Sequence, residues 1–152
     1  MDIYKVIKQD HDLMRSMLKD LCKTGNDQGK QREAQFTPLK NELMMHQQVE
    51  EAVVYNPLKD TGETRDEALE AIAEHHLVNG LLEELALMPK DSDEWFAKFG
   101  VLKELVEHHM KEEEGEFFDA ARKVIDRDRA QEMAKQMRTK KEAGLRALQP
   151  VE

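Results

Sequence analysis

Residues 46–51, HQQVEE, and residues 109–114, HMKEEE, repeat one arrangement: a histidine with a glutamate four positions later. Residues four apart lie one above the other on an α-helix, so each pair presents two metal-binding donors on the same face. The positions that precede each pair on that face are apolar, with Leu39 before the first pair and Leu102 before the second. The two stretches therefore predict two helices that direct a His–Glu pair toward the protein interior.

The other half of each repeat begins with a single histidine. His11 and His75 both start a run of apolar residues at helical spacing, and a shift of 64 residues places one run on the other. An acidic residue precedes each histidine, Asp10 in the first run and Glu74 in the second. The chain is thus predicted to form two helix hairpins related by an approximate twofold axis.

The same periodicity predicts four long helices and a helical tail. Their expected ranges are about 2–23, 31–54, 65–87, 94–125 and, for the basic tail, 126–149. Long helices joined by short loops favour an all-α, up-down-up-down four-helix bundle. We expect this bundle to span residues 1–125, with an additional C-terminal helix in residues 126–152 that packs on the bundle or docks a protein partner.

The composition agrees with a helical domain and excludes several classes of function. Of the 152 residues, 39% are hydrophobic and 36% charged, with only seven Gly and four Pro, as in a single domain of amphipathic helices. The net charge of −9 argues against nucleic-acid binding, which needs a basic surface. A single cysteine and the lack of a long apolar run predict a cytoplasmic protein that does not enter the membrane.

Six polar residues occupy positions on the apolar stripes where Leu or Ile would normally lie. Burying carboxylates without compensation costs several kcal/mol each, a large share of a stability of about 5–15 kcal/mol. Cations that take the carboxylates and neutral imidazoles together remove this cost. The mixed nitrogen and oxygen donors suit a pair of iron ions, with manganese or zinc as alternatives, and the glutamates are natural bridging ligands. The expected ligands are His11, His46, Glu50, His75, His109 and Glu113.

Some neighbouring residues compete with this assignment. His76 and His108 lie one position from their stripes and are expected at the surface or beside the ligands, but a slip of one residue would exchange them with their neighbours. Glu112 or Glu114 could replace Glu113 in the same way. Tyr55 and Phe118 are expected to close one end of the bundle. Met14, next on the stripe after His11, is a candidate to line a ligand pocket.

At these residues the sequence resembles the hemerythrin-like HHE cation-binding domains, from about Ile3 to Ile125. The resemblance implies a four-helix bundle with a di-iron centre held by the six residues above. Oxygen-carrying hemerythrins have a second histidine four positions after the one that matches His75, where this chain has Asn79. The invertebrate carriers place the last carboxylate at the position of Glu114. The missing nitrogen ligand argues against reversible oxygen carriage.

Three functions follow as hypotheses. The first is a di-iron protein that senses or handles oxygen, nitric oxide or peroxide, or buffers iron. The second is an enzyme that turns over peroxide or nitric oxide at the same metals; because no cleft or motif for a larger substrate is evident, a non-enzymatic role is favoured. The third is an interaction module in which metal only holds the helices together and the C-terminal helix binds a protein partner.

Overall fold

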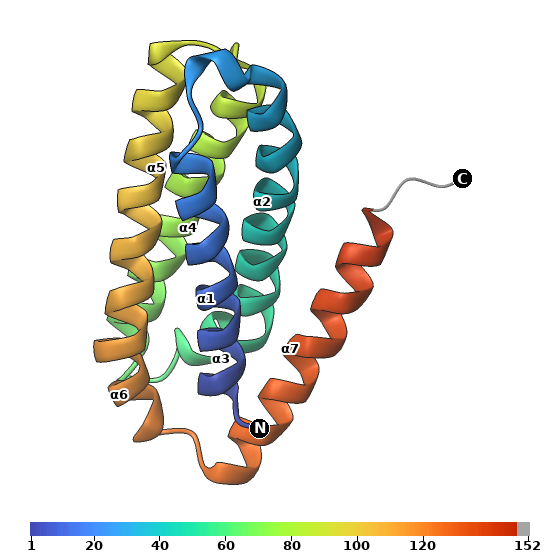
Figure 1. Ribbon diagram of the computed structural model, residues 1–152. Coiled ribbons are helices and arrows are strands. Elements are labelled where there is room, and N and C mark those ends of the chain that lie inside the picture. The colour runs from blue at the N-terminus through green and yellow to red at the C-terminus, as the bar shows by residue number, and fades with distance from the viewer. Residues whose placement is uncertain (149–152) are drawn as a thin grey trace.

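The computed structural model describes residues 1–148, and this part of the chain contains helices and no strands. Four long helices lie side by side and alternate in direction: α1 (Ile3–Cys22), α2 (Gly29–Glu50), α4 (Arg65–Leu87) and α5 (Asp93–Glu112) (Figure 1). The expected up-down-up-down bundle is therefore confirmed. Short connections, including the 3₁₀ turn η1 (Asn26–Gln28), join the helices.

Side-chain caps explain where three of the helices begin. Asp2, Ser92 and Asp126 each precede a helix, and each side chain accepts a hydrogen bond from the backbone N–H three residues later. Such a cap satisfies one of the backbone donors that a helix start leaves without a partner. The helix α2 begins at Gly29, earlier than predicted, and Pro38 lies inside it with an exposed ring.

Each of the two helices with a His–Glu pair continues into a π-helical turn. These turns are η2 (Glu51–Tyr55), which leads into α3 (Asn56–Leu58), and η3 (Glu113–Phe117), which leads into α6 (Phe118–Arg122). A π turn contains one residue more than an α turn and is frequent at functional sites. It changes the face on which later residues lie, so residues 31–54 and 94–125, predicted as uninterrupted helices, have a local irregularity beside the site.

A polar layer divides the interior into two hydrophobic clusters. One cluster contains Ile7, Val53 and Phe117, together with residues of α3, α6 and α7. The other contains Leu43 and Trp95 and fills the end of the bundle near the α1–α2 and α4–α5 connections. The polar residues of the repeats lie between these clusters.

The last helix, α7 (Arg127–Ala147), lies beside α1 and α2 and leans away from the bundle toward its C-terminal end (Figure 1). Its buried face consists of Ala130, Met133, Ala134 and Met137. Residues 149–152 of the predicted C-terminal segment lie outside the described residues. Among residues 1–148, no helix combines the length and the apolar character that a membrane span requires.

Candidate metal centre

The polar layer brings all six predicted ligands together. Each long helix contributes at least one of them, and every one is at most 8% exposed. They are His11 on α1, His46 and Glu50 on α2, His75 on α4, His109 on α5 and Glu113 at the start of η3. Four helices that are distant in sequence thus place four imidazoles and two carboxylates in one buried layer.

The Nε2 atoms of the four histidines face the centre of this layer. His11 Nε2 lies 2.9 Å from Glu113 Oε1. The two oxygens of Glu50 lie 3.4 Å from the Nε2 atoms of His46 and His75. The Nε2 atoms of His75 and His109 are 3.2 Å apart.

These donors form two groups that share one carboxylate. In one group, ligand atoms of His11, His46, Glu50 and Glu113 lie within 4.8 Å of one another. In the other, ligand atoms of Glu50, His75 and His109 do the same. The arrangement therefore fits two cations side by side, with Glu50 placed to bridge them.

Several potential metal-binding atoms in the layer have no hydrogen-bond partner of suitable geometry within the described chain, although some lie close to one another. They are both oxygens of Glu50, Oε1 of Glu113 and Nε2 of His11. Buried polar atoms without partners destabilise a fold by about 1–3 kcal/mol each, and charged ones by more. Cations would take these lone pairs, so the donor set fits a pair of metal ions of the iron, manganese or zinc type.

The opposite nitrogen of every one of these histidines contacts a carboxylate. Such partners fix the ring orientation and leave Nε2 free for a metal. The Nδ1 contacts are His11 with Glu114 at 2.8 Å, His46 with Asp10 at 2.7 Å, His75 with Glu51 at 3.3 Å and His109 with Glu74 at 2.8 Å. The four acids obey the internal repeat, since Asp10 matches Glu74 and Glu51 matches Glu114. The repeat therefore extends to the partners of the predicted ligands, a role for these acids that was not predicted from the sequence.

Without metal, the charges of the layer are only partly balanced. Burial lowers the pKa of His46, but the Glu50 carboxylate and Asp10 raise it to about 10 overall. Burial likewise lowers the pKa of His75, while the nearby Glu50 and Glu51 carboxylates raise it to about 9. Burial would raise the pKa of Glu50, yet the His46 charge holds it well below the usual range. Burial and the Glu50 charge raise the pKa of Glu113. In the metal-free protein, protonated histidines thus supply the positive charge that metal ions would supply.

Tyr55 belongs to the site, in contrast to its expected role at the bundle end. Its buried hydroxyl donates a hydrogen bond to Glu113 Oε2, and its ring makes edge contacts with His75 and Phe117. Burial and the Glu113 charge raise the pKa of Tyr55 well above its ordinary value, which keeps the phenol protonated. Phe118, in contrast, packs against Tyr4 in the hydrophobic cluster.

The residues that the sequence offered as alternative metal ligands lie outside the buried polar layer. His76 is exposed. The His108 side chain is 63% exposed and contacts Glu112 at 2.9 Å. Glu114 contacts the outer nitrogen of His11 and also pairs with Arg15. None of these residues is part of the two buried donor groups.

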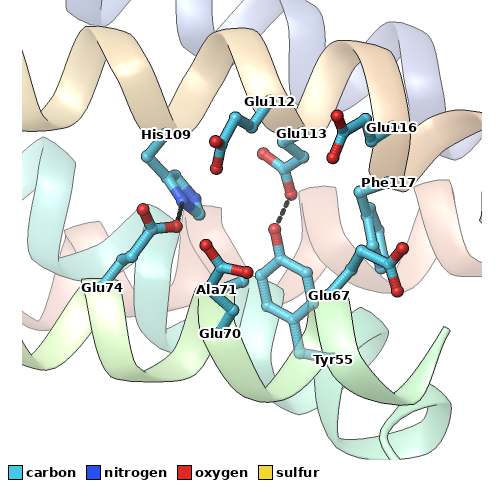
Figure 2. A pocket seen from close by; sticks show the side chains of 10 residues that line it. All are labelled: Tyr55, Glu67, Glu70, Ala71, Glu74, His109, Glu112, Glu113, Glu116 and Phe117. Atoms are coloured by element: carbon cyan, nitrogen blue, oxygen red, sulfur yellow. Dashed lines mark hydrogen bonds and ion pairs between the residues drawn. The ribbon is translucent and has the colours of Figure 1, made fainter.

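Two cavities adjoin the polar layer. The smaller, of about 10 Å³, is lined by the four histidines and by mostly apolar side chains, which include Met14, Val78 and Met110. Met14 thus occupies the pocket-lining position considered from the sequence. The larger, of about 30 Å³, is lined by Tyr55, His109 and six glutamates, one of which is Glu113 (Figure 2). One side of the layer is therefore apolar and the other strongly acidic.

The C-terminal helix also reaches the site. Lys141 on α7 contacts Asp10 Oδ1 at 2.7 Å and pairs with Glu42 on α2. Asp10 in turn contacts His46 through its other oxygen. The chain of contacts Lys141–Asp10–His46 connects α7 with the centre of the bundle.

Comparison with known proteins agrees with this geometry. The family model of the hemerythrin HHE cation-binding domain matches residues 2–121. The chain is also similar to the crystal structure of a hemerythrin HHE cation-binding domain-containing protein from Mycobacterium kansasii. The TM-score is 0.84 and the identity 23%, over 97% of this chain and 89% of the other, a likeness that shows the fold. No curated protein matches the sequence.

Proposed function

The chain belongs to the hemerythrin HHE cation-binding domain family, and on this basis we propose that it is a non-haem di-iron protein that senses or handles oxygen, nitric oxide or peroxide. Metal binding itself is supported by the family and by the His/Glu groups of the interior. Iron as the metal, a count of two and the small ligand are the proposal.

The observation that carries the proposal is the convergence of four Nε2 atoms on two buried carboxylates. Glu50 faces His46 and His75 with its two oxygens at equal distances of 3.4 Å, as a bridging carboxylate would. Glu50 belongs to both donor groups. The group with His11 and His46 has two imidazoles and two carboxylates, whereas the group with His75 and His109 has two imidazoles and one carboxylate. The second group thus supplies fewer donors, which favours it as the place for an external ligand. An iron pair would supply a change of oxidation state and an open coordination position.

The surroundings suit a small, uncharged ligand. The apolar cavity of about 10 Å³ beside the histidines has room for no more than about one water-sized molecule. Its Met14, Val78 and Val106 side chains exclude bulk water. On α4 the cavity is lined by His75 and Val78. Tyr55 holds one oxygen of Glu113 by a hydrogen bond and keeps a proton at that edge of the site.

The test is a spectroscopic one on the full chain loaded with Fe(II) without oxygen. Exposure to oxygen, nitric oxide or peroxide in separate samples should change the visible absorption in proportion to the iron bound. If fully iron-loaded protein shows no change with any of the three, the proposal is wrong. Steady-state consumption of peroxide or nitric oxide, as opposed to one equivalent per site, would assign catalysis in place of sensing.

We also propose that the C-terminal helix is part of the structural unit and not a free docking element. Its apolar face is buried against α1 and α2, and Lys141 is held between Asp10 and Glu42. This attachment favours metal binding over the interaction-module hypothesis as the main function of the chain.

A further inference from the structure

The larger of the two cavities, called here the acidic cavity, has more glutamates in its lining than the six predicted ligands account for. Its lining includes Glu67, Glu70 and Glu74 from α4, Glu112 from α5, and Glu113 and Glu116 from η3. In Figure 2 these carboxylates surround the space in front of Tyr55 and His109. No lysine or arginine lines the cavity. Like charges at this density repel one another unless a cation is present.

The carboxylates become more buried from the surface toward the centre. Glu70 and Glu116 are exposed, and Glu67, Glu74 and Glu112 are half-buried. The innermost, Glu113, is 2% exposed, and its Oε1 atom has no hydrogen-bond partner. Glu113 lines the cavity and also faces His11 Nε2. This one carboxylate therefore connects the cavity directly with the predicted metal position.

A third donor group lies at the outer part of this route. Ligand atoms of Glu74, His108 and Glu112 lie within 4.8 Å of one another, close enough to hold one cation. Two of the three residues line the cavity, and His108 is exposed. Glu74 also contacts His109 Nδ1, so the outer group and the buried centre share a contact.

We propose that this acidic cavity is the entry path of divalent cations to the buried centre, with Glu74, His108 and Glu112 as an outer holding site. The inference rests on the proposed metal function. The other cavity has no carboxylate in its lining and is closed by apolar side chains beside the histidines, so it offers a hydrated cation little solvation. The cation and the small uncharged ligand would therefore approach from different sides. A funnel of one charge sign raises association rates by roughly 10- to 1,000-fold, and salt weakens the effect.

The test compares the rate at which metal-free protein takes up Co(II), followed by visible absorption after rapid mixing at low salt. The variant Glu70→Gln/Glu116→Gln removes two outer charges that contact no predicted ligand. The matched control, Glu83→Gln/Glu104→Gln, makes the same net-charge change at exposed positions of α4 and α5 outside the cavity.

The cavity variant should load about tenfold more slowly, reach the same final Co(II) content and show a weaker salt dependence of the loading rate, while the control should load like the wild type. Equal rates in all three proteins, or equal slowing in both variants, would overturn the entry path and leave the metal site intact. A wild type that takes up no Co(II) would overturn the proposed function together with the path.

The outer holding site has its own variant. His108→Ala should slow Co(II) loading without lowering the final content, because His108 lies outside the buried donor groups. An unchanged loading rate would remove His108 from the path.

Discussion

The assignment of Glu113 and not Glu114 to the metals can be tested by a pair of neighbouring substitutions. Glu113 Oε1 faces His11 Nε2 at 2.9 Å in the buried centre, whereas Glu114 contacts the outer Nδ1 of the same ring at 2.8 Å. The first position predicts a ligand and the second a residue that orients a ligand. Glu113→Gln and Glu114→Gln change almost no volume, so the two variants differ mainly in which contact they alter.

The expected magnitudes differ clearly. Loss of a carboxylate that orients a metal-bound histidine typically costs 10- to 100-fold in affinity, or about 1.4–2.8 kcal/mol. Glu114→Gln should therefore keep two metals per chain at saturation, with affinity lowered by that factor. Glu113→Gln removes a ligand from the group of His11, His46 and Glu50. Its metal content should fall to about one per chain even at saturation, because the second group does not include Glu113.

The assay is a titration of metal-free protein with Fe(II) under anaerobic conditions, in competition with a coloured chelator, followed by measurement of bound metal. Thermal melts of the metal-free variants serve as the control for folding. The reasoning would be refuted by the reverse pattern, in which Glu114→Gln loses a metal and Glu113→Gln retains two. Equal, small effects of both changes would also contradict it, since they would leave the buried carboxylate without a role.

Three further predictions concern the surroundings of the centre. Lys141→Met removes the cation that pairs with Asp10 and Glu42; Asp10 keeps its contact with His46, but the largely buried Glu42 carboxylate is left without a cation. The change should cost about 3 kcal/mol, a fall of about 6–12 °C in Tm, while Lys140→Met at an exposed position should change little. Equal Tm values for the two variants would show that the ion pair adds no stability. Tyr55→Phe removes the hydroxyl that bonds Glu113 and should destabilise the metal-free protein by about 1–3 kcal/mol, with a smaller loss in the metal-bound form, as measured by chemical denaturation of both. In the folded metal-free protein the pKa values of His46 and His75 are raised to about 10 and 9, so protonation of these histidines stabilises the fold. This stabilisation is complete below the unfolded pKa of about 6.5 and is lost as the pH rises through 9–10. Denaturation between pH 6 and 10 should show the decline without metal, and a decline of the same size with metal bound would contradict the exchange of protons for cations.

Much of the architecture follows from local patterns in the sequence. Apolar spacing predicted the four bundle helices, and the one over residues 65–87 agrees with the structure at both ends. The family assignment and the all-α bundle are confirmed. The repeat also brought the six proposed ligands to one layer, since residues in equivalent positions of equivalent helices meet around a twofold axis. Their role as ligands remains a prediction.

The features that could not be predicted from the sequence depend on local irregularities and on contacts between helices. The π turns η2 and η3 change the register after each His–Glu pair, and a 3.6-residue period cannot reveal them. Tyr55, expected at the bundle end, turns toward Glu113 because of the turn that contains it. Lys141 reaches Asp10 only because α7 packs against α1. The acids beside the histidines did carry a signal, since Asp10 and Glu74 obey the repeat, but the helix that each one faces is set by tertiary packing.

The most direct test of the central claim is the metal content of freshly purified, chelator-free protein, compared with a His46→Ala/Glu50→Ala variant. Glu50 lies in both donor groups and His46 in one, so this change should disrupt both metal positions. The proposal predicts about two irons per wild-type chain, lost in a variant that keeps its helical content. Wild-type protein that holds no metal and cannot be reconstituted with iron, manganese or zinc would contradict it.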